Sequence, residues 1–107
     1  MNTDAIFNTA RQQIGDLIEQ QFSDAKEAAR QDAEQVIQQS KDRLARWTQL
    51  LADGKIDEEE FGILVDSQKE VVEMTALNQV GLTPDRARQL AISTLEIVAR
   101  VAIAAAV

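Results

Sequence analysis

The chain has 107 residues, a formal net charge of −7 and a hydrophobic share of 45%, and it contains no Cys, His or Tyr. The length allows one domain, and the hydrophobic share argues against full disorder. The acidic balance excludes a phosphate-binding surface rich in Lys and Arg, and the absence of Cys, His and Tyr removes most of the usual nucleophiles and bases. We therefore expect neither nucleic-acid binding nor enzymatic activity.

The first predicted helix extends from about residue 4 to residue 52. A continuous helix of that length would be ~70 Å long. Its apolar positions follow steps of four, four and three residues, an eleven-residue repeat typical of a straight or slightly right-handed helix. The repeat consists of Ile14, Ile18, Phe22, Ala25, Ala29, Ala33, Val36, Ser40, Leu44, Trp47 and Leu51. A break near Ser23 and Asp24 stays open as an alternative, because either residue can cap a new helix.

A second helix is predicted over residues 57–80. Gly54 is placed to end the first helix in the left-handed conformation, and Asp57 and Glu60 have the spacing of a capping box. Gly81 is placed to end the second helix. The acidic first turn of this helix matches the positive end of the helix dipole, which favours a helix start at this point.

A third helix is predicted over residues 84–107, starting from Thr83 as cap and Pro84 as first helical residue. Nearly all its side chains are apolar, apart from one narrow polar stripe: Gln89, Ser93, Glu96 and Arg100. Because such a helix must be covered, we predict that it forms the core of a homo-oligomer. The predicted interface residues are Leu95, Val98, Ala99, Ala102 and Ala106.

The whole chain is predicted to form one all-α domain, because no segment shows the alternation of a strand. With short turns, the second and third helices cover only residues ~28–52 of the first helix. If the first helix is continuous, its N-terminal half has no cover in its own chain. Oligomerisation is then expected to complete the bundle, and four side chains face a second copy or another protein: Phe7, Ile14, Ile18 and Phe22.

Residues 44–64 resemble the short bacterial helical hairpin called SHOCT. The resemblance is carried by Leu44, Leu50, Leu51, Asp53, Gly54, Ile56, Glu59, Glu60 and Phe61. It implies a role in oligomerisation, although the chain lacks the lysine-rich, leucine-ended second helix of that family. The same stretch is similar to the second half of an EF-hand calcium loop. Gln49 and Leu51 stand where the leading carboxylates of such a loop belong, so we expect no bound calcium.

Two classes of function follow from these patterns. The first is a non-catalytic, self-assembling structural, scaffold or adaptor protein without a cofactor or metal. The alternative is a carrier or coat protein associated with lipid, membrane or a polymer granule through its third helix. The charges of Glu96 and Arg100 near the middle of that helix disfavour a membrane span. The first residues lack the features of a signal peptide, so cytoplasmic residence is expected.

Overall fold

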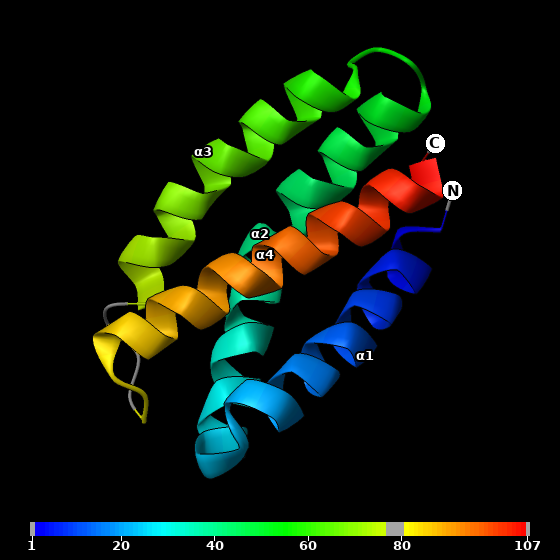
Figure 1. Cartoon of the computed structure of the whole chain (residues 1–107). Coiled ribbons are helices and arrows are strands. Elements are labelled where there is room, and N and C mark those ends of the chain that lie inside the picture. The colour runs from blue at the N-terminus through cyan, green and yellow to red at the C-terminus, as the bar shows by residue number, and fades with distance from the viewer. Residues whose placement is uncertain (1, 77–80, 107) are drawn as a thin grey trace.

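The computed structural model describes residues 2–76 and 81–106. These residues contain no strand, so the all-α fold class is confirmed, and they form the following elements: α1 Thr3–Gln21, the short 3₁₀ turn η1 Ser23–Ala25, α2 Lys26–Ala52, α3 Glu58–Ala76 and α4 Pro84–Ala106. Helices α2 and α4 cross at the centre of the molecule, and α1 and α3 lie on either side of α4 (Figure 1). The predicted helix positions 77–80 and 107 lie outside the described residues.

The corner between α2 and α3 has the local geometry that its sequence predicts. Gly54 has a positive φ of 72°. The Asp57 side chain accepts a hydrogen bond from the Glu60 N–H at 2.8 Å, and the Glu60 carboxylate accepts one from the Asp57 N–H at 3.2 Å. The capping box is therefore confirmed. Glu60, which matches the bidentate ligand of an EF-hand loop, has its carboxylate engaged by the backbone instead.

The start of α4 is also set by local chemistry. The Thr83 hydroxyl accepts a hydrogen bond from the Arg86 N–H at 3.3 Å, as expected of a cap. Gly81 has a φ of 103°, and a Cβ at this position would lie 2.7 Å from the Cβ of Ala28. Gly81 is thus required twice, for the backbone conformation and for the close approach to α2.

The structure does not contain the predicted continuous helix over residues 4–52. Helix α1 ends at Gln21, the chain reverses through η1, and α2 begins at Lys26. The longest dimension of the molecule is 41 Å, which is well short of the continuous helix. No side-chain hydrogen bond caps the start of η1 or of α2, so the break does not arise from the capping that Ser23 and Asp24 suggested.

Arg86, at the start of α4, holds the reversed corner closed. Its guanidinium donates two hydrogen bonds of 2.8 Å to the Asp24 carboxylate and one of 3.3 Å to the Gln21 carbonyl oxygen. The same group lies 5.0 Å from the centre of the Phe22 ring, within range of a cation–π contact. The guanidinium lowers the pKa of the Asp24 carboxyl. These contacts join residues far apart in sequence, so the corner depends on tertiary structure.

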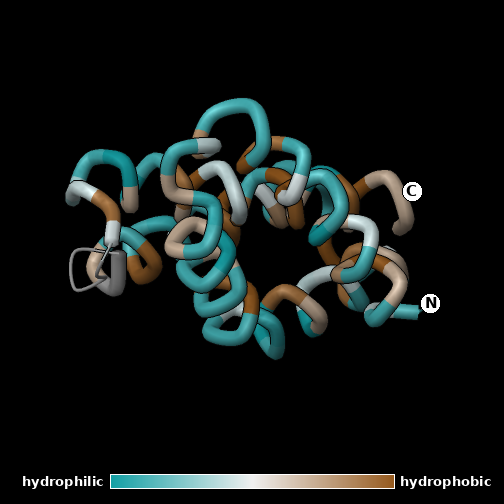
Figure 2. The backbone as a smooth tube through the Cα atoms, turned by 90° about the horizontal axis from the view of Figure 1, so that it is seen from below, coloured by the Kyte–Doolittle hydropathy of each residue, from teal (hydrophilic) through white to brown (hydrophobic). Residues whose placement is uncertain are grey.

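The reversal of α1 covers the side chains for which the sequence suggested a partner. The four predicted partner-facing residues are all buried within the chain: Phe7, Ile14, Ile18 and Phe22. In the end-on view most hydrophobic stretches turn toward the interior of the bundle (Figure 2). The exposed surface is 6031 Å², against about 5,900 Å² expected for a compact monomer of this mass. One copy therefore covers the apolar face of α1, and the reason for predicting a partner at α1 does not apply.

A buried polar contact fixes α3 against α2. Ser40, the one polar residue in the eleven-residue repeat, is fully buried and accepts a 2.9 Å hydrogen bond from the Gln68 amide. The Gln68 carbonyl oxygen in turn accepts a 2.9 Å hydrogen bond from Arg43. Because each polar group has a partner, this contact sets the register of the two helices without leaving Gln68 unsatisfied.

Asp32 is a buried carboxyl group whose Oδ2 atom has no hydrogen-bond partner within the described chain. Burial raises the pKa of Asp32 above its ordinary value. The folded state therefore binds this proton more tightly than the unfolded state does. This tighter proton binding stabilises the folded state at low pH, and the stabilisation is lost as the pH rises through the folded-state pKa of Asp32.

We therefore expect Asp32→Asn to stabilise the protein at pH 7. The expected rise in melting temperature is about 4–8 °C, which corresponds to about 1 kcal/mol in a chain of this size. The gain should shrink as the pH is lowered, because the wild-type carboxyl group then becomes neutral as well. Thermal melts followed by circular dichroism at several pH values measure this. Asp42→Asn, at an exposed position on the same helix, is the control and should change little.

Candidate interaction surface

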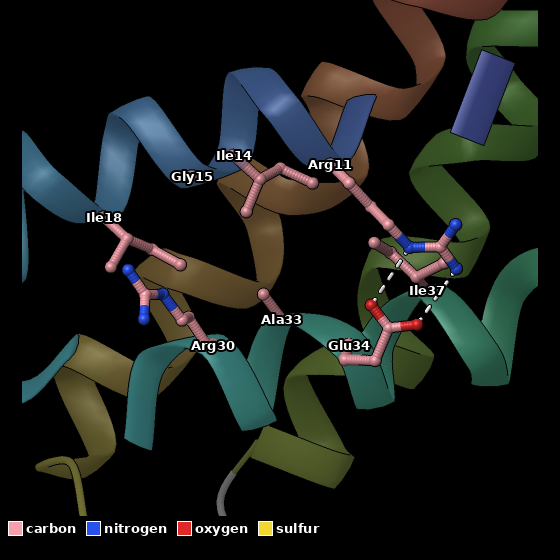
Figure 3. Close-up of a pocket in the computed structure, with 8 residues that line it drawn as sticks. All are labelled: Arg11, Ile14, Gly15, Ile18, Arg30, Ala33, Glu34 and Ile37. Carbon is pink, nitrogen blue, oxygen red and sulfur yellow. Dashed lines mark hydrogen bonds and ion pairs between the residues drawn. The ribbon is translucent and has the colours of Figure 1, made fainter. Parts of the chain in front are cut away.

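A shallow groove separates α1 from α2 on one side of the molecule (Figure 3). Its floor is apolar and is formed by Ile14, Ile18, Ala33 and Ile37. Gly15 lies in its wall, and a Cβ there would meet no atom within 4 Å. The groove is therefore an open apolar strip rather than an enclosed cavity.

The charged groups of this groove hold the two helices together. The Arg11 guanidinium donates hydrogen bonds of 3.1 and 2.9 Å to the two carboxylate oxygens of Glu34 (Figure 3). Arg11 thereby lowers the pKa of Glu34. Paired in this bidentate way, neither group is placed to act on a substrate, and their role here is to fix α1 on α2.

A second groove runs between α1 and α4. Its end near the two chain termini is formed by uncharged side chains, which we call the terminal patch: Asn2, Ala5, Ile6, Thr9, Val101 and Ala105. The hollow between them has a volume of about 360 Å³. Helix α4 carries no charge after Arg100, so its last described turns, which include exposed Ala104 and Ala105, extend this uncharged surface.

The next part of the same groove has charged side chains of both signs. Asp16 on α1 and Arg100 on α4 line it, as does Glu96, which is paired with Lys69 of α3. Asp16 and Arg100 are exposed, and neither forms an ion pair within the described chain. The groove between α1 and α4 therefore has an uncharged end, followed by a part that carries unpaired Asp16 and Arg100.

The predicted interface residues of the third helix lie mainly inside one copy. Four of them are buried in the core of the chain: Leu95, Val98, Ala99 and Ala102. The fifth, Ala106, is half-buried. Their burial needs no second copy, because α4 packs against α1, α2 and α3. What α4 leaves uncovered is its polar stripe and its last turns. In that stripe Glu96 pairs with Lys69 of α3 at 3.3 Å rather than with Arg100.

The described residues contain no group of three or more His, Cys, Asp or Glu side chains that could hold a metal ion. The hydroxyl of Ser67 donates to the carbonyl oxygen of Leu64 at 2.7 Å, a bond within its own helix. Glu70 and Glu73 have the spacing of half a di-iron motif, but nothing in the described chain completes it.

Sequence reasoning missed the side chains that connect the helices. Arg86, Arg11 and Gln68 each contact a residue at least 23 positions away. Arginine and glutamine on a helix are ordinarily solvent-exposed, so the positions of Arg86, Arg11 and Gln68 in the sequence did not indicate these contacts. Ser40 did give an indication, because a polar residue within an apolar repeat suggests a buried polar partner.

Helix α4 is long and apolar enough to cross a membrane by length and composition alone. No family model, curated protein or solved structure matches the chain.

Proposed function

We propose that the protein is a non-catalytic, self-assembling scaffold or adaptor whose copies meet through the groove between α1 and α4. The observation that carries this proposal is an exposed groove whose uncharged end, the terminal patch, is followed by a part lined by unpaired Asp16 and Arg100. Protein interfaces typically have a centre depleted of charge and a polar rim. This groove offers both kinds of surface, an uncharged patch and a charged margin on one side of it.

The position of the charges favours a two-fold arrangement. In a two-fold interface the same surface of each copy meets the other, so a residue of one copy lies opposite a different residue of its partner. If the two-fold axis passes between Asp16 and Arg100, Asp16 of each copy lies opposite Arg100 of the other, which gives two ion pairs. Exposed Ala104 and Ala105 have small side chains that permit close approach of the two α4 helices.

The test exchanges the two charges. Asp16→Arg and Arg100→Asp each place like charges opposite one another at two points, and we expect each to weaken the dimer at least about tenfold, or roughly 1.4 kcal/mol. The double variant restores opposite charges and should recover assembly. Light scattering during size-exclusion chromatography measures the mass. A wild-type chain that is monomeric at every concentration, or a double variant no better than the singles, contradicts the proposal.

The length and apolar character of α4 support a second candidate, a lipid-associated carrier or coat protein. Insertion into lipid would require α4 to leave α1, α2 and α3, whose apolar faces it covers. Native mass spectrometry in aqueous buffer separates the two candidates. A discrete oligomer without lipid supports self-assembly, whereas lipid-laden or detergent-dependent particles support the carrier.

A further inference from the structure

The outer face of α3 carries large apolar side chains that the chain itself leaves exposed. Ile63 is 63% exposed and Met74 is 71% exposed, and no other large hydrophobic residue of the described chain is comparably open. The two residues are eleven positions apart, which is about three helical turns, so they lie on the same face. Most other bulky apolar residues of the described chain lie in the core or pack against it.

Acidic side chains surround this apolar pair. We define the α3 outer face as the residues around it: Glu59, Ile63, Asp66, Glu70, Glu73 and Met74. Glu59 and Glu70 each lie one turn before an apolar member of the face. Within the described chain Glu59, Glu70 and Glu73 form no ion pair, while Asp66 pairs with Lys69 at 3.2 Å.

Two side chains of α3 anchor the helix to the rest of the molecule. Lys69, at the margin of the outer face, bridges Asp66 of that face and Glu96 of α4, and Gln68, on the opposite side of α3, bonds to Ser40 of α2. The one basic side chain of α3 is therefore directed toward α4. These contacts fix the orientation of α3, so the outer face presents negative charge and two exposed apolar side chains.

We propose that the α3 outer face binds a basic, amphipathic helical segment of another protein. Apolar side chains of that segment pack on Ile63 and Met74, and its Lys or Arg side chains pair with Glu59 and Glu70. The distance between the two apolar residues, about 16 Å along the helix axis, requires about three turns of partner helix. Recognition of an amphipathic helix through apolar contacts and complementary charge is a recurrent mode of binding.

The charge of this face selects among possible occupants. A second copy of the chain would bring carboxylates against carboxylates, which is unfavourable. An anionic membrane surface is disfavoured for the same reason. The binding surface is separate from the groove between α1 and α4, so it goes beyond self-assembly and does not depend on it.

The test uses a fluorescent 18-residue peptide with Leu on one helical face and Lys on the other. A second peptide with Glu in place of Lys is the control probe. Fluorescence anisotropy should show binding of the Lys peptide to the wild-type chain, weakening as salt is raised, and no binding of the Glu peptide. We expect Ile63→Ser combined with Met74→Ser to weaken binding at least about tenfold, and Glu70→Gln to weaken it and reduce its salt dependence.

Matched variants locate the site. Asp42→Asn removes an exposed acid from α2 and should leave peptide binding unchanged, as should Asp16→Arg, which disturbs only the groove between α1 and α4. All these positions are exposed, and a melt of each variant verifies folding. The proposal is overturned if the double variant at Ile63 and Met74 binds the Lys peptide as tightly as the wild type does, or if the wild type does not bind it. Variant-sensitive binding to zwitterionic vesicles in place of the peptide would assign the face to lipid and also overturn it.

Discussion

Replacing Ala102 by Asp is expected to unfold the chain, whereas Ala105→Asp, three residues later on the same helix, is expected to leave it folded. Ala102 is 0% exposed at the centre of the bundle, while Ala105 lies at the surface of the terminal patch. An unpaired charge in an apolar core costs several kcal/mol. That cost is comparable with the total stability of about 5–15 kcal/mol for a small protein.

Circular dichroism melts and light scattering distinguish the two outcomes. We expect Ala102→Asp to lose its cooperative melt at 25 °C or to melt far below the wild type. Ala105→Asp should melt close to the wild type and, if copies meet through the groove between α1 and α4, should lower the particle mass. If Ala102→Asp melts at the same temperature as the wild type, α4 is not part of the core of the single chain.

The corners that could be predicted from the sequence are those set by neighbouring residues. Gly54 ends α2 because it tolerates a positive φ, and Asp57 caps α3 because its side chain reaches the Glu60 N–H. Thr83 acts in the same way at α4. Each of these signals involves residues a few positions apart, so spacing alone reveals it.

The corner between α1 and α2 lies where the sequence left a break open as an alternative, near Ser23 and Asp24, but local signals did not favour that break over a continuous helix. The eleven-residue repeat continues through Phe22 and Ala25 without a proline or glycine, which favours an unbroken helix. The contact that closes the corner comes from Arg86, 62 residues after Asp24. Here tertiary packing overrides a local preference that is worth little per residue.

Most of the predicted interface residues on α4 are buried within one copy for a related reason. The composition of α4 shows that Leu95, Val98 and Ala102 must be covered, but it does not show which helix covers them. Once α1 turns back, the chain supplies that cover itself. The apolar side chains that stay exposed lie at the surface of the bundle, such as Ala105 and those of the α3 outer face. Exposed Ile63 is visible only when the packing of α3 is known.

The reversal of α1 has a direct experimental signature, because the chain contains no cysteine and spin labels can be placed at two chosen sites. Gln12 on α1 and Gln35 on α2 are exposed and lie next to the bonded pair of Arg11 and Glu34. Packed helix axes lie about 8–10 Å apart, whereas 23 residues of continuous helix would separate the sites by about 35 Å. For Gln12→Cys combined with Gln35→Cys, we expect a distance distribution by pulsed electron spin resonance centred well below 30 Å.

Dilution with an excess of unlabelled protein makes the measured distance intramolecular, which is the necessary control. If the short distance persists on dilution, α1 packs on its own α2, and the self-assembly proposed above uses the surface of an already complete bundle. If dilution instead yields a peak near 35 Å, the repeat that passes through Phe22 and Ala25 forms one straight helix. In that case α1 packs on a second copy, Asp24 no longer reaches Arg86 in the observed geometry, and assembly takes place by exchange of α1 between chains.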